Sequence, residues 1–83
     1  MNIPEFTTHV WTPAYEQTLV GIYLRRMFYK LQDNKWYSYS PFSETWFPTL
    51  NNQDWFNEEI KEGYLVSLET FNSPNFIPKK EVV

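Results

Sequence analysis

Two strand-like runs joined by a pair of turn-forming residues constrain the fold of this chain more than any other feature. Residues 27–32 and 35–40 are rich in aromatic and other β-forming side chains, and Asp33 and Asn34 lie between them. This pattern predicts a β-hairpin over about 27–40. With a two-residue loop, the expected cross-strand pairs are Gln32 with Lys35, Leu31 with Trp36, Lys30 with Tyr37, Tyr29 with Ser38, and Phe28 with Tyr39.

A helix is the alternative for the segment that leads into this hairpin. Apolar side chains recur there at the spacing of an amphipathic helix, at Val20, Leu24, Met27, Phe28 and Leu31. Thr12 and Pro13 would supply its N-cap and first helical residue. Residues 19–24, however, are rich in β-forming side chains and contain a glycine. We favour the strand, and the choice for residues 19–31 stays open at this point.

A hairpin in this register has aromatic side chains on both of its faces. One face holds Met27, Tyr29, Leu31 and Trp36, and the other holds Phe28, Tyr37, Tyr39 and the stem of Lys30. A half-buried antiparallel sheet usually keeps one face polar. The second aromatic face must therefore be covered by another part of the molecule or by a partner.

A helix is predicted over about 52–62. Asn51 and Asn52 are suitable N-caps, and Gly63 follows as the C′ residue. Phe56 and Ile60 lie one helical turn apart, so we expect the helix to dock on the sheet through these two side chains, with Trp55 beside them.

The remaining segments complete a single α+β domain of 83 residues, built on a small antiparallel sheet. Residues 64–69 predict a strand that returns to this sheet. Residues 1–18 predict an irregular or edge segment in which residues 9–11 form a short strand, residues 41–50 predict a loop, and residues 72–83 predict an extended tail.

Aromatic side chains are more abundant than a domain of this length needs. The chain has seven Phe, six Tyr and four Trp, and each can bury about 150–250 Å². A small core cannot hold them all, and Tyr and Trp suit surfaces that become dry only on binding. We therefore predict a contact surface for a protein partner, made of Phe28, Tyr37, Tyr39, Trp46 and Phe47.

The sequence lacks the signatures of catalysis and of cofactor binding. There is no cysteine, and His9 is the only histidine, so a zinc site of the usual Cys and His ligands cannot form within one chain. Asp54 and Glu58 lie on one face of the predicted helix. Acidic residues are common on a solvent-exposed helix face, so this pair does not indicate a metal site. The two glycines are isolated and form no phosphate-binding loop. We expect a protein that is not an enzyme and has no metal and no cofactor.

The charge pattern argues against duplex DNA as a ligand. The net charge is −3 and the basic residues are scattered, whereas a duplex requires a dense basic stripe. Aromatic rings beside cations on a sheet can still stack the bases of a single strand. Single-stranded nucleic acid or a nucleotide-like ligand is therefore the alternative to a protein partner, with Arg26, Phe28, Lys30, Tyr37 and Tyr39 as its site.

The N-terminus has no basic region followed by an apolar run, as a signal peptide would have. The longest apolar-leaning run, residues 19–24, is too short to cross a bilayer. We expect a cytoplasmic protein with no membrane partner.

The sequence of residues 29–37, followed by Trp46 and then by residues 55–66, resembles small accessory proteins of tailed bacteriophages. The resemblance covers about half of the chain. It implies a protein that acts in the host cytoplasm by stoichiometric binding to a host protein, with inhibition as one consequence, or by sequestering a small ligand. A homodimer is the expected accompaniment. No site residue is transferred from this resemblance.

Overall fold

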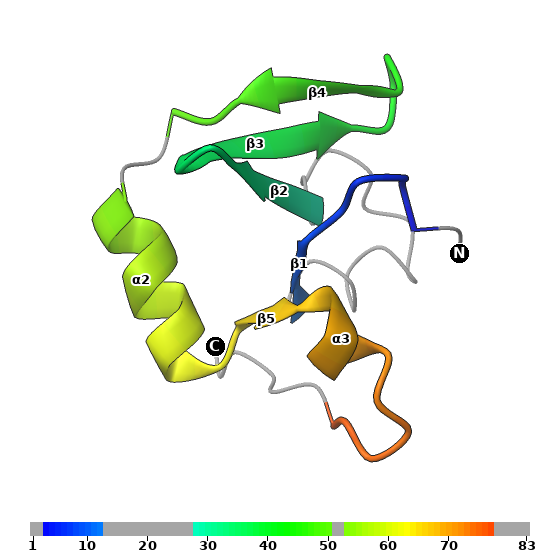
Figure 1. Cartoon of the computed structure of the whole chain (residues 1–83), viewed down its shortest axis with the longest axis vertical. Helices are drawn as coiled ribbons and strands as arrows, with labels where there is room; N and C mark the ends of the chain where they lie inside the picture. The colour runs from blue at the N-terminus through cyan, green and yellow to red at the C-terminus, as the bar shows by residue number, and fades with distance from the viewer. Residues whose placement is uncertain (1–2, 13–27, 51–52, 78–83) are drawn as a thin grey trace.

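The computed structural model describes residues 3–12, 28–50 and 53–77 (Figure 1). Within these residues a five-stranded antiparallel sheet has the order β4-β3-β2-β1-β5, and two helices accompany it. The predicted α+β class is confirmed. The elements are β1 His9–Trp11, β2 Phe28–Gln32, β3 Lys35–Ser40, β4 Thr45–Pro48, α2 Gln53–Glu62, β5 Leu65–Ser67 and α3 Leu68–Phe71.

The predicted hairpin is formed by β2 and β3, with the expected register from Tyr29 opposite Ser38 to Gln32 opposite Lys35. Asp33 and Asn34 have φ values of 52° and 63°. Two successive residues of positive φ make a turn whose twist matches the flanking strands, and Asp and Asn tolerate this region better than other non-glycine residues. The helical alternative is wrong for residues 28–31, and residues 19–27 lie outside the described part.

The short strand β1 lies inside the sheet. His9 pairs with Tyr29 of β2 on one side and with Ser67 of β5 on the other, and Val10 is fully buried. The composition of the N-terminal segment indicated an irregular or edge position. The sequence of a three-residue strand does not show whether the strand is interior or at an edge. The position of β1 depends on its pairing with segments that are distant in the sequence.

The loop predicted at residues 41–50 contains the edge strand β4. Trp46 lies opposite Tyr39 and Phe47 opposite Ser38, so the prediction of a loop is wrong for residues 45–48. Pro48 suggested a break, but proline is compatible with an edge strand, where its missing N–H costs no ladder hydrogen bond.

Helix α2 packs on one face of the sheet through Phe56, which is 0% exposed. Its ring stacks on that of Trp36 with centroids 4.2 Å apart and meets the Tyr29 ring edge-on at 5.4 Å. Leu65 of β5 completes this cluster and Trp55 packs against it. Figure 1 shows α2 running along the side of the sheet from the level of β3 to that of β5. Docking through Phe56 and Trp55 is confirmed.

Docking through Ile60 is wrong, because 43% of this side chain is exposed. The helix is turned so that Glu59 faces the sheet, where its Oε1 accepts a hydrogen bond of 3.2 Å from Nε1 of Trp11. Near the start of the helix, Oε1 of Gln53 accepts a bond of 3.1 Å from Nε1 of Trp36. Two indole N–H groups therefore fix the rotation of α2 about its axis.

The end of α2 follows the prediction. Gly63 has a φ of 84°, a region that costs glycine little. Its N–H bonds to the carbonyl of Ile60 at 3.1 Å, and the N–H of Tyr64 bonds to that of Glu59 at 3.0 Å. This Schellman arrangement satisfies two carbonyls at the helix end and turns the chain toward β5. The proposed caps at residues 51–52 lie outside the described part.

The strand predicted at 64–69 is shorter than expected, because a second helix begins at Leu68. Ser67 caps α3 by accepting a hydrogen bond of 3.2 Å from the N–H of Thr70. Residues 72–77 form turns, and the ring of Phe76 lies 5.9 Å from that of Phe71. This part of the predicted tail is therefore folded back on α3. None of the helices in residues 3–12, 28–50 and 53–77 has the length and apolar character to cross a membrane.

Candidate functional site

The sheet face opposite α2 gathers most of the predicted contact residues. Side chains alternate between the faces of a strand, so Lys30 of β2 shares this face with Lys35, Tyr37 and Tyr39 of β3. Trp46 of β4 joins them because it lies opposite Tyr39. We call these five side chains the aromatic face.

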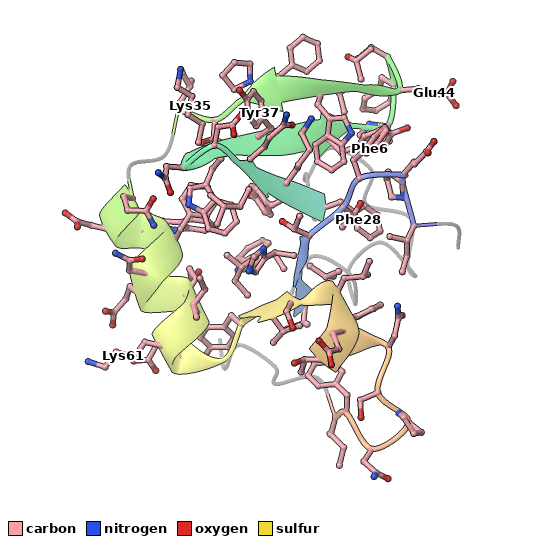
Figure 2. All side chains as sticks on the ribbon, viewed as in Figure 1. Phe6, Phe28, Lys35, Tyr37, Glu44 and Lys61 are labelled. Carbon is pink, nitrogen blue, oxygen red and sulfur yellow. The ribbon has the colours of Figure 1, made fainter. Side chains whose placement is uncertain are left out.

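At the centre of the aromatic face, three rings surround the ammonium group of Lys30. Its Nζ lies 4.9 Å from the ring centroid of Tyr37, 5.3 Å from that of Trp46 and 6.0 Å from that of Phe6. These distances are those of cation–π contacts. We call Lys30, Tyr37, Trp46 and Phe6 the Lys30 cluster. Figure 2 shows two of its rings, Phe6 on the segment that precedes β1 and Tyr37 on β3.

Phe6 has an unusual backbone conformation, with a φ of 74°. Positive φ is rare for a bulky residue and costs about 1–3 kcal/mol. Thr7 holds the turn, since its N–H and Oγ1 both donate to the carbonyl of Pro4, at 3.3 and 2.7 Å. The ring of Phe6 is 67% exposed. Phe6 was not among the predicted site residues, because only this turn brings its ring beside a lysine on another strand.

Three of the predicted site residues are not part of the exposed aromatic face. Phe28 lies on the same side of the sheet as Lys30, but it is only 6% exposed and packs with Val10, against which Tyr39 and Trp46 also pack. Phe28 therefore supports the aromatic face from within the core. Phe47 lies on the other face of the sheet, opposite Ser38, and is 41% exposed. Arg26 lies outside the described residues. Among those described, Lys30, Tyr37, Tyr39 and Trp46 are brought together, and the structure adds Phe6 and Lys35.

The net negative charge of the chain is not evenly spread over the fold. Asp54, Glu58 and Glu62 are exposed on α2, and this helix packs on the opposite face of the sheet. In residues 3–12, 28–50 and 53–77, Lys30 has contacts with aromatic rings and with no carboxylate. The aromatic face therefore carries positive charge although the protein as a whole is acidic.

His9 lies away from this site, on the face that α2 covers. Its ring meets the Trp36 ring edge-on at 4.8 Å, and its Nδ1 is 2.9 Å from Oγ1 of Thr8. The same oxygen accepts a hydrogen bond of 2.8 Å from the N–H of Leu31. Burial lowers the pKa of His9. The Thr8 hydroxyl therefore ties the N-terminal segment to β2, beside a histidine whose charged form is disfavoured by burial.

We expect the stability of the protein to fall as the pH decreases below about 6.5, the ordinary pKa of histidine. The unfolded chain binds a proton at His9 more readily than the folded protein does, because burial lowers the pKa in the fold. The stabilisation is thus complete above the ordinary pKa and is lost progressively below it. Melting temperatures at about pH 7.5 and about pH 5.5 should differ more for the wild type than for His9→Gln. An equal decrease in both proteins would contradict this assignment.

In the described part of the chain, no three His, Asp or Glu side chains lie together in a way that could hold a metal ion. Comparisons of the chain with protein-family models, with curated proteins and with solved structures found no significant match.

Proposed function

We propose that this chain is a non-enzymatic binding protein that contacts a protein partner, in a stoichiometric complex, through its aromatic face. The observation that carries the proposal is the Lys30 cluster, in which the N-terminal segment, β2, β3 and β4 each contribute a side chain to one surface. Tyr and Trp have rigid rings with a polar group, and they dominate the energetics of protein interfaces.

The resemblance to phage accessory proteins extends this proposal to a host protein as the partner, in the host cytoplasm, with inhibition of that protein as one outcome. A homodimer belongs to the same proposal. Exposed apolar rings outside the aromatic face, such as that of Phe42, offer further area for either association.

Single-stranded nucleic acid or a nucleotide-like ligand is the second candidate. The observation that favours it is the mixture of cations and rings on the aromatic face, where Lys30 and Lys35 lie beside Tyr37 and Tyr39. Bases stacked on such rings each contribute about 1–3 kcal/mol. Binding through phosphates weakens steeply with added salt, whereas contacts dominated by buried rings do not, so the salt dependence of binding separates the two candidates.

Replacing Tyr37 or Tyr39 by alanine should weaken association more than it weakens the fold. An interface anchor contributes about 2 kcal/mol or more, a loss of about thirtyfold in affinity, whereas a surface substitution changes stability by about 0.5 kcal/mol. Tyr39 also packs against the Val10 and Phe28 cluster, so its variant should melt lower than Tyr37→Ala. The measurements are thermal melting, sedimentation for self-association, and affinity capture from a bacterial lysate.

Phe47→Ala is the matched control, because Phe47 is an exposed ring on the opposite face of the neighbouring strand. It should leave association intact. If both tyrosine variants melt far below the wild type, these rings belong to the core and the contact surface lies elsewhere. If they melt normally and every association persists, the aromatic face is not the contact surface.

A further inference from the structure

We propose that Lys30 is an anion-binding centre on the aromatic face, and that it pairs with a carboxylate in an acidic segment of the protein partner. An apolar or aromatic side chain next to that carboxylate would pack on Tyr37 and Trp46. This inference rests on the proposed function and names the chemistry of the partner.

The ammonium of Lys30 is held in place before any ligand arrives. A free lysine side chain loses up to about 2 kcal/mol of conformational entropy when it is fixed in one position. Here Tyr37 and Trp46 hold Nζ at 4.9 and 5.3 Å from their ring centroids. Tyr37 is the direct cross-strand neighbour of Lys30. Because the fold already restricts the Lys30 side chain, less conformational entropy is lost when a ligand binds, and this favours binding.

Phe6 gives an independent indication that the cluster has a function. Its backbone is in a conformation that bulky residues avoid, and its ring is mostly exposed. Unfavourable backbone conformations concentrate at binding and catalytic sites. An exposed ring fixed at 6.0 Å from the ammonium contributes little to the core, but it adds an apolar wall beside the cation.

The positive charge of Lys30 is available to an external anion. Within the described residues its ammonium contacts rings and no carboxylate. Glu5 and Glu44 lie in turns and are exposed, and the acidic residues of α2 belong to the other side of the sheet. Lys30 is half-buried, and a carboxylate that reaches its ammonium would form a charge-assisted hydrogen bond next to apolar rings, where such bonds are strongest.

One carboxylate fits this surface better than a chain of phosphates. Proteins that follow a single strand use a continuous basic groove, whereas the described part of the aromatic face has Lys30 and Lys35 as its only cations. The net charge of −3 also repels a polyanion. A single fixed ammonium among rings is complementary to an acidic residue beside an apolar one.

The test is a titration of isotope-labelled protein, followed by NMR, with a capped Trp-Glu-Leu peptide. The peptide should shift the signals of the Trp46 indole and the Lys30 side chain in a saturable way. The matched Trp-Gln-Leu peptide should bind about tenfold more weakly, because a hydrogen bond to a charged group is replaced by a neutral one. Lys30→Met keeps the apolar stem and should lose about tenfold in affinity for the glutamate peptide.

Lys61→Met is the matched control, since Lys61 is an exposed lysine on α2, which packs on the opposite face of the sheet. It should bind the glutamate peptide nearly as well as the wild type, and both variants should melt normally. Equal binding of the two peptides would overturn the inference and leave the aromatic face as the contact surface. Tighter binding of a short oligothymidylate than of the glutamate peptide would overturn it in favour of nucleic acid. If no probe gives a saturable shift, the inference also fails, and the Tyr37→Ala capture experiment decides separately on the proposed function.

Discussion

Replacing Phe56 by alanine should destabilise the protein by about 3–5 kcal/mol, which is enough to unfold a domain of this size under ordinary conditions. The Phe56 ring is completely buried and contacts the rings of Tyr29, Trp36 and Trp55. Its removal would leave a cavity at the point where α2 meets the sheet. Circular dichroism during urea unfolding measures the loss directly.

Ile60→Ala provides the comparison for this experiment. Ile60 lies one turn further along the same helix, but its side chain is largely exposed. Its replacement should cost well under half as much as that of Phe56, since little apolar surface returns to water. Equal losses in the two variants would mean that α2 docks through both side chains, as the spacing of apolar residues alone indicated.

The sequence predicted those parts of the fold that local interactions determine. The hairpin register follows from two residues that accept positive φ, Asp33 and Asn34, and the end of α2 follows from Gly63. The places of β1 and β4 in the sheet depend on partners distant in sequence or on an edge that tolerates proline, so local patterns could not reveal them. Ile60 was misplaced because apolar spacing does not include the indole hydrogen bond that turns Glu59 toward the sheet.

The candidate site was predictable to the same extent. The register of the hairpin brought Lys30 and Tyr37 together as a cross-strand pair, and the surplus of aromatic residues indicated a contact face. Phe6 entered only through the conformation of its turn. Trp46 was predicted as a contact residue, but its position beside Lys30 required β4 to pair with β3.

Replacing Trp36 by alanine should cost about 3–5 kcal/mol, as much as the loss of Phe56. Trp36 is buried on the face that α2 covers, and its ring stacks on that of Phe56 with an angle of 3° between the ring planes. Its ring also contacts His9. The variant therefore loses apolar burial together with ring contacts that contribute about 0.5–1.5 kcal/mol each. Leu31→Ala is the matched control, because Leu31 is the cross-strand partner of Trp36 but is exposed.

The variant Trp36→Phe distinguishes the contribution of the aromatic ring from that of the indole N–H group. Phenylalanine keeps much of the stacking on Phe56 but cannot donate the 3.1 Å hydrogen bond to Gln53, so its cost should be about 1–2 kcal/mol. Because Gln53 is the first residue of α2, this loss should appear as faster amide exchange in the first turn of the helix. Amide exchange that is unchanged there, with a stability equal to the wild type, would show that the bond does not anchor α2. In that case Trp11, through its bond to Glu59, would alone fix the rotation of the helix.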